Sequence, residues 1–158
     1  MSNPTKIYKI RFRLSIPDPE MPQPRYHTTL FIQTPLDTLN GTGTTHHVTG
    51  DLVTGMVYQK RFETSAPDND EMFFSKELLG YIKDDVDEEG IEEVLKTLEP
   101  PGKQKRYNHK TGRTEQFKPE GGFYEVGEGR PAMRKCTEWI EEQAIPALRE
   151  SGVLIAEK

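Results

Sequence analysis

The chain has one cysteine, Cys136, in a stretch that could form the start of a helix. Arg130, Arg134 and Lys135 precede it. The thiolate is the nucleophilic form of cysteine, and both nearby cations and the N-terminal end of a helix lower the pKa of a thiol. The segment therefore indicates a candidate nucleophile. The alternative is that Cys136 is a small buried side chain on an apolar helix face, which is the commoner role of a lone cysteine.

Three histidines upstream could supply a base for this thiol. His27 lies in a stretch rich in β-branched and aromatic residues, and His46 and His47 lie in the next such stretch. Adjacent residues of a strand point to opposite faces, so only one of His46 and His47 can share a pocket with His27. We favour His47. It could provide the third group that a base needs to orient its ring toward a thiol.

The same three side chains, Cys136, His27 and His47, could instead bind zinc. Three protein ligands with an open fourth position are typical of catalytic zinc sites. The spacing here is not diagnostic of such a site, and a single cysteine excludes both a CxxC motif and an internal disulfide. We therefore predict no metal and no cofactor.

The elements that must position these residues begin with a series of strands. Alternation of apolar and polar residues, together with β-branched and aromatic content, predicts strands. The four predicted strands cover residues 7–16, 25–33, 44–48 and 52–62. Gly50-Asp51 is the predicted turn between the last two. Residues 7–62 are therefore expected to form an antiparallel meander.

Beyond residue 62 the apolar spacing changes to a helical one. A helix is predicted over 87–98, because four apolar residues recur at i, i+3, i+4 and i+7. The cysteine-bearing helix is predicted over 131–150, opening at Pro131 and kinked or ended at Pro146, which has no N–H to donate. Also predicted are a short helix over 75–81, a hairpin turn over 108–112 and a short strand over 153–156.

These elements predict an α+β fold in which an antiparallel sheet packs against a few helices. The length of 158 residues is that of one domain, 1–158. Within it we expect three regions, which are a strand-rich one over 7–62, a helical and loop-rich one over 63–130, and the cysteine-bearing helix over 131–150.

The charge and the hydropathy of the chain restrict the partners and the location that we expect. A net charge of −5 disfavours binding to nucleic acid or anionic lipid. A solvated hairpin accounts for the basic run over 103–113, although it could meet an anionic partner. No stretch approaches the roughly 18 apolar residues of a membrane helix, and the N-terminus has no apolar signal region. We therefore expect a cytoplasmic protein.

The order of the motifs is informative. A strand with Tyr26-His27-Thr28, a strand ending His46-His47-Val48, and a helix opening Lys135-Cys136-Thr137-Glu138-Trp139 follow one another. This order resembles the circularly permuted papain-like fold of the NlpC/P60 superfamily, in the branch with lecithin:retinol acyltransferase-like and PPPDE-like proteins. The chain is also similar to short, uncharacterised fungal proteins with a "YH" strand, an "HV" strand and a "C-x-x-W" helix.

This resemblance implies a role for each candidate residue. Cys136 would be the nucleophile, His27 the base and His47 the residue that orients His27. The implied function is a cysteine-dependent hydrolase or acyltransferase acting on an amide, ester or thioester of a small molecule or peptide. The alternative is a catalytically silent binding or interaction module of the same fold, since a fold does not by itself imply activity. The oligomeric state and the identity of the substrate stay open.

Overall fold

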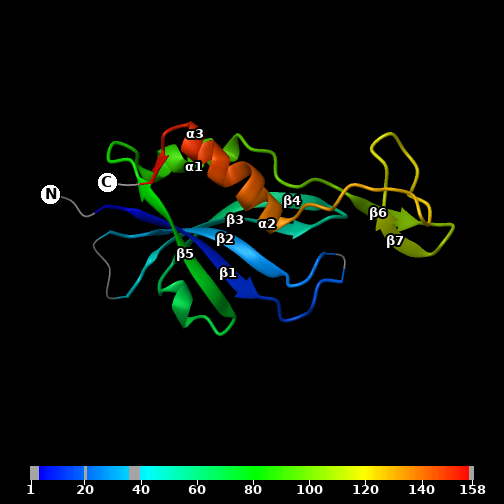
Figure 1. Ribbon diagram of the computed structural model, residues 1–158, viewed down its shortest axis with the longest axis horizontal. Coiled ribbons are helices and arrows are strands. Elements are labelled where there is room, and N and C mark those ends of the chain that lie inside the picture. The colour runs from blue at the N-terminus through cyan, green and yellow to red at the C-terminus, as the bar shows by residue number, and fades with distance from the viewer. Residues whose placement is uncertain (1–3, 20, 36–39, 157–158) are drawn as a thin grey trace.

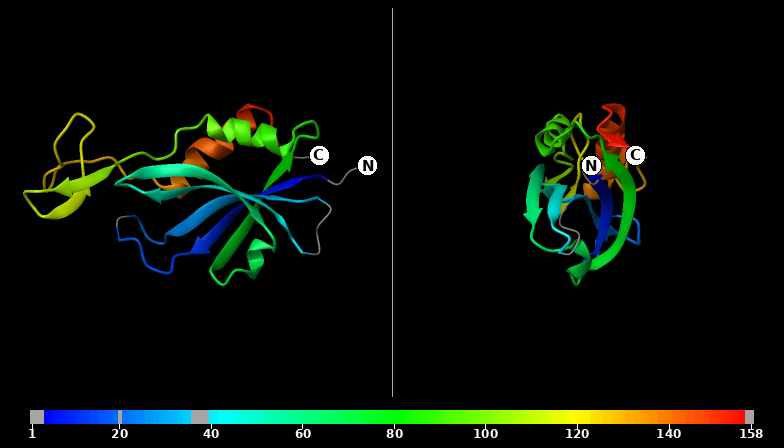
Figure 2. Two further views of the ribbon diagram at one scale, coloured as in Figure 1. Left: turned by 180° about the vertical axis from the view of Figure 1, so that it is seen from behind. Right: turned by 90° about the vertical axis from the view of Figure 1, so that its left-hand side faces the viewer.

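The fold is built on a curled six-stranded antiparallel sheet whose strand order is β4-β3-β2-β1-β5-β8 (Figure 1, Figure 2). The computed structural model describes residues 4–19, 21–35 and 40–156. The strands are β1 (Lys6–Arg13), β2 (Tyr26–Gln33), β3 (Gly43–Asp51), β4 (Gly55–Glu63), β5 (Phe73–Ile82) and β8 (Leu154–Ile155). The predicted α+β class and the antiparallel meander over 7–62 are confirmed.

The helices lie together over one face of the sheet (Figure 2). They are α1 (Glu88–Lys96) and a continuous helical run made of α2 (Cys136–Glu138), the π-helix η2 (Trp139–Ala144) and α3 (Ile145–Glu150). The predicted helix over 87–98 is confirmed as α1. Asp87 caps it, since its side chain accepts a hydrogen bond from the Gly90 N–H at 2.8 Å.

A second, two-stranded sheet projects from one end of the molecule (Figure 1). It pairs β6 (Lys105–Asn108) with β7 (Arg113–Gln116), and the predicted hairpin turn joins them. A single 3-10 turn, η1 (Pro67–Asn69), precedes β5. The predicted terminal strand is also present, as β8 paired with the end of β5.

The helix predicted over 75–81 is wrong, because this stretch belongs to β5. That strand pairs antiparallel with β1 along nearly its whole length, with irregularities that shift the register. The free edge of β1 therefore decides the conformation of a stretch whose local pattern was ambiguous. Gly80 allows the close approach of β8, because a Cβ on it would lie 2.3 Å from the backbone oxygen of Ile155.

The prediction for the last helix is wrong at its start, and the helix does not end at Pro146. Residues 131–135 are not helical, and the helix begins at Cys136 itself. It runs on through Pro146 to Glu150. The turns before the proline widen to a π-helix, in which the Ile145 N–H pairs with the Ile140 oxygen, five residues back. The hydrogen-bond spacing therefore changes from four to five residues just before Pro146, which has no N–H to donate.

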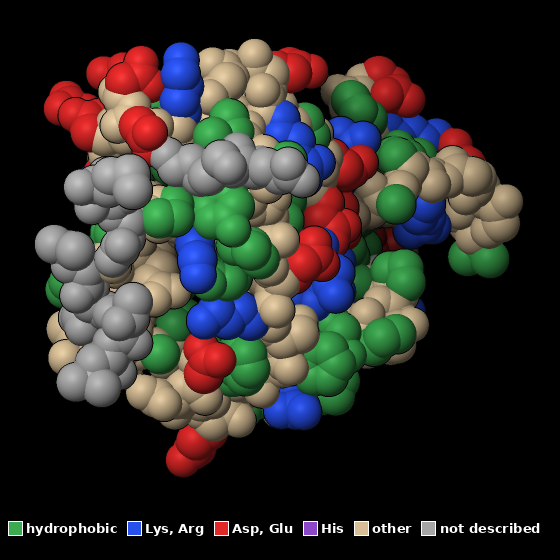
Figure 3. Space-filling model, turned by 60° about the vertical axis from the view of Figure 1, so that its left-hand side comes forward, with side chains coloured by type: hydrophobic (Ala, Val, Ile, Leu, Met, Phe, Trp, Pro, Cys, Tyr) green, Lys and Arg blue, Asp and Glu red, His purple; other side chains and the backbone are tan. Residues whose placement is uncertain are grey.

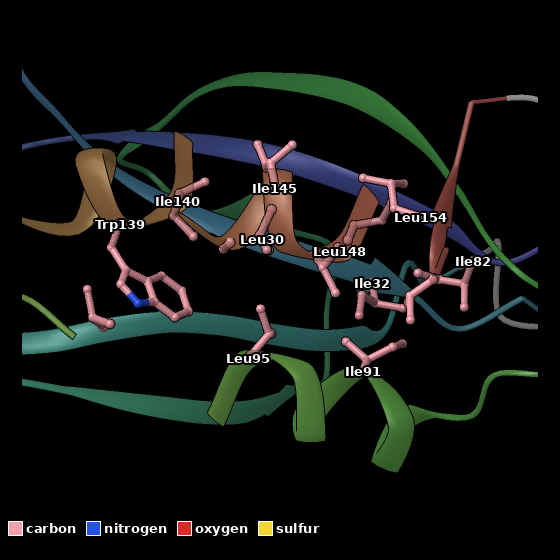
Figure 4. Packing of buried hydrophobic residues seen from close by; sticks show 14 of the residues in the cluster. Leu30, Ile32, Ile82, Ile91, Leu95, Trp139, Ile140, Ile145, Leu148 and Leu154 are labelled. Carbon is pink, nitrogen blue, oxygen red and sulfur yellow. The ribbon is translucent and has the colours of Figure 1, made fainter. Parts of the chain in front are cut away.

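The core lies between the helices and the sheet (Figure 4). Trp139 and Leu148 of the last helix, Leu95 of α1 and Leu30 of β2 have no exposed surface. Burial of such side chains is the main stabilising contribution to the fold. Outside the core, side chains of both charge signs are interspersed on the face shown in Figure 3. Two such charges, Lys9 and Glu141, tie β1 to the helix at 3.2 Å.

Candidate functional site

The site lies where the central sheet opens between β2 and β3. These two strands pair only from Leu30–His46 to Gln33–Gly43. Beyond Leu30 and His46, β2 stays paired with β1 and β3 with β4. The strands separate there, and the first turn of the cysteine-bearing helix packs against β2. Thr137 binds the hydroxyl of Thr28 at 2.7 Å.

Cys136 is the first residue of this helix and is 7% exposed. Its thiol is hydrogen-bonded to His27 and to the backbone of Thr28. A strand residue ordinarily offers its backbone N–H to a neighbouring strand. Because β3 has separated from β2 at this point, the backbone of Thr28 forms a hydrogen bond with the sulfur of Cys136 instead.

The pKa of the Cys136 thiol is lowered from its ordinary value. Burial raises it, but the hydrogen bond to His27, the charge of that ring, the backbone of Thr28 and the cation of Arg25 together lower it by more. A thiol with such surroundings has more of the reactive thiolate at neutral pH than a free cysteine.

His27 is held on its far side by His47. The His27 Nε2 and His47 Nδ1 atoms lie 3.2 Å apart, and the two rings meet edge to face. With Nε2 of His27 directed at His47, we infer that Nδ1 is the nitrogen that faces the sulfur of Cys136. The three predicted residues are therefore contiguous, in the order Cys136, His27, His47.

His47 is neutral at physiological pH. Burial, together with the charges of His27 and Arg61, lowers its pKa to about 4, against the opposing effects of a hydrogen bond to Gln59 and of the Glu63 carboxylate. That hydrogen bond joins His47 Nε2 to Gln59 Oε1 at 3.3 Å. Gln59 was not singled out in the sequence, because only the pairing of β3 with β4 places it opposite His47.

His46 points to the opposite face of β3, into the core. It is fully buried, and its Nδ1 lies 2.6 Å from the hydroxyl of Tyr58. Burial lowers its pKa to about 4. The structure thus separates the two adjacent histidines, one beside His27 and one beneath the helix.

Two ion pairs that the sequence analysis missed hold the stretch before β2 against the helix start. Arg25 makes a two-pronged contact with Glu138, at 2.7 and 3.0 Å, and its side chain is 8% exposed. Lys135 pairs with Asp18 at 2.6 Å. The partners are more than 100 residues apart in sequence, so no local pattern signals them. Together they fix the start of the helix that carries Cys136 to the loop before β2.

A cleft of about 590 Å³ also lies beside this helix. Met21, Met133, Arg134 and Glu138 are among the residues that line it. Positions 136 and 138 of a helix point about 200° apart. The cleft therefore opens on the other side of the helix from the sulfur, and a ligand in it would reach Cys136 across the helix start.

The zinc alternative has no ligand set in the part of the chain that the structure describes. No three His, Cys, Asp or Glu side chains are grouped there as a metal ion requires.

Among the described helices, none is long and apolar enough to cross a membrane. No curated protein and no solved structure matches the chain. One family model matches residues 14–155, which include the whole candidate site. The chain therefore belongs to DUF6540, a family of unknown function.

Proposed function

We propose that the protein is a cysteine-dependent hydrolase or acyltransferase. Cys136 is the nucleophile, His27 the general base, and His47 the residue that orients His27. The observation that carries this proposal is the hydrogen bond between a thiol at a helix start and a half-buried histidine, together with the lowered pKa of that thiol.

The proposed reaction is acyl transfer. The thiol proton of Cys136 passes to His27, and the sulfur attacks the carbonyl carbon of an amide, ester or thioester. The negative charge on the carbonyl oxygen is stabilised by backbone N–H groups of the first helical turn, which an α-helix leaves unpaired. His27 then protonates the leaving group. Water or an amine attacks the acyl-enzyme, returns a proton to His27, and frees the thiol.

The permuted papain-like relationship supports this assignment and is part of the proposal. In that arrangement a strand with the histidine precedes a helix that begins at the cysteine. Here His27 lies in β2, and Cys136 is the first residue of the helix that packs against it. We further propose a small-molecule or peptide substrate, a cytoplasmic location and a single domain over residues 1–158.

A second candidate function is a silent binding module of the same fold. The observation that favours it is the burial of the thiol, since Cys136 is only 7% exposed. In this alternative Cys136 packs in the core and His27 contributes only to stability.

The two functions are distinguished by the pH dependence of iodoacetamide alkylation at Cys136. The enzyme requires an apparent thiol pKa well below the ~8.5 of free cysteine, and a marked loss of reactivity in His27→Ala. His109→Ala is the matched control, since His109 lies in the turn after β6 and packs on Tyr107. A thiol that reacts only after unfolding would refute the proposed enzymatic function and favour the binding module.

A further inference from the structure

The side chain of Gln59 ends the chain of contacts that begins at Cys136. It lies on β4, directly opposite His47 of β3, and its Oε1 atom is 3.3 Å from His47 Nε2. The contact chain then runs from His47 Nδ1 to His27 Nε2 at 3.2 Å and from His27 to the thiol. His47 is held on both of its ring nitrogens, and His27 contacts both His47 and the thiol.

The Oε1 atom of Gln59 determines which ring nitrogen is protonated in His47 and, through it, in His27. An amide oxygen can only accept, so His47 must carry its proton on Nε2. Neutral imidazole has one protonated nitrogen, so Nδ1 of His47 presents a lone pair. His27 must therefore carry its proton on Nε2, facing His47. The Nδ1 atom of His27 is then bare and faces the thiol.

We propose that Gln59 is a positioning residue that sets the tautomer of both histidines, and so leaves His27 Nδ1 free to accept the Cys136 proton. This inference rests on the proposed function. In the step it prepares, the S–H bond breaks, the electron pair stays on sulfur and an N–H bond forms at Nδ1. The hydrogen bonds to His47 and Gln59 keep their direction throughout.

Burial of His47 strengthens this arrangement. The residue is 4% exposed and its pKa is lowered to about 4, so it stays neutral while His27 takes up the proton. The charged groups near these rings are Arg61 and Glu63 of β4, which face His47, and Arg25, which faces the thiol. All three stay in place when Gln59 is changed, so an effect of the change reports on the hydrogen bond.

The test compares Gln59→Leu, which removes the acceptor, with Gln59→Glu, which keeps one. At pH 7 we expect iodoacetamide to alkylate Cys136 about tenfold more slowly in Gln59→Leu, as for a rise of about one unit in the thiol pKa. Gln59→Glu should stay within about threefold of the unchanged protein. The control is Val57→Leu, at an exposed position on the same face of β4, which should change nothing.

Two outcomes would overturn the inference, and a third concerns the proposed function. If Gln59→Leu reacts as fast as the unchanged protein while His27→Ala is still slow, the role of Gln59 is refuted and the proposed function is not. A ¹⁵N spectrum in which His27 carries its proton on Nδ1 also refutes the role of Gln59. An unaffected His27→Ala variant would instead refute the proposed function itself. Gln59 is exposed on an edge strand, so its variants are expected to fold, and their melting curves check this.

Discussion

Replacing Arg25 by methionine tests how its ion pair with Glu138 stabilises the start of the helix that carries Cys136. The guanidinium of Arg25 grips the carboxylate of Glu138 at 2.7 and 3.0 Å, with side-chain exposures of 8% and 23%. Methionine keeps the length and apolar bulk of the arginine stem but removes its charge and donors. Glu138 retains one partner, the backbone N–H of Lys135 at 2.7 Å.

The expected loss of stability follows from these contacts. Each hydrogen bond to a charged group contributes about 1.5–3 kcal/mol, and leaving a fully buried charge without its partner costs about 3–5 kcal/mol. Water and the Lys135 N–H offset part of this cost at Glu138. We therefore expect a decrease of about 2 kcal/mol in the free energy of unfolding. For a chain of this length that lowers Tm by about 4–8 °C.

Urea and thermal unfolding at pH 7 measure this change, with Arg11→Met as the matched control. Arg11 pairs with Glu141 at 3.3 Å, but both side chains are more than a third exposed. Its loss should cost less than about 0.5 kcal/mol. A difference between the two variants of less than about 0.5 kcal/mol would refute the view that the Arg25–Glu138 contact holds this end of the helix.

The dependence on pH gives a second check on the same pair. Burial raises the pKa of the Glu138 carboxyl, but Arg25 and the Lys135 N–H lower it by more, so the net pKa is lowered. A lowered carboxyl pKa stabilises the fold above the ordinary value of about 4.3 and loses that effect as the pH falls through the folded value. The deficit of Arg25→Met should therefore be full at pH 7 and should shrink in acid below pH 4.

Three further changes probe the site and its scaffold. Cys136→Ser should abolish alkylation and leave Tm nearly unchanged, because the hydroxyl can take up the partners of the thiol. A loss of about 1–3 kcal/mol would instead mark a side chain that is only part of the core. His46 has a folded pKa of about 4 against an ordinary 6.5, so the unfolded chain binds more protons between these values and stability should fall as the pH drops from 6.5 to 4. Urea unfolding at a series of pH values measures this loss, which should be smaller in His46→Gln, a variant that keeps a partner for Tyr58. An unchanged dependence of stability on pH would contradict the burial of a neutral ring. Gly80→Ala should lower Tm strongly, since the added Cβ would lie 2.3 Å from a backbone oxygen of β8, whereas Gly102→Ala meets no atom within 4 Å and should be near neutral; equal effects would argue against the close approach.

The sequence by itself determined most of the scaffold. Alternating side chains and a high content of β-branched and aromatic residues predict β1 to β4. The central strands β2 and β3 are nevertheless buried on both faces over most of their length. The i, i+3, i+4, i+7 spacing in 87–98 predicts α1, because it places the apolar residues on one face of a helix. The alternation rule also assigned His46 and His47 to opposite faces, and the structure places His47 beside His27 and His46 against Tyr58.

The tertiary structure decided where local preferences were weak or absent. Residues 73–82 have a pattern compatible with a helix, and only the unpaired edge of β1 makes them a strand. The helix could open at Pro131 by its sequence, yet it begins at Cys136, where the carboxylate of Glu138 accepts the Lys135 N–H. That shift of five residues puts the thiol in the first turn, where the helix dipole acts on it.

The candidate site combines both contributions. The types and order of His27, His47 and Cys136 are visible in the sequence, since side-chain chemistry belongs to each residue. The separation of β2 from β3, the contact of Arg25 with Glu138 and the contact of Gln59 with His47 are not, because each depends on strands or side chains that are distant along the chain. Hydrogen bonds and ion pairs between such residues leave no periodic pattern, so only the folded chain brings them together.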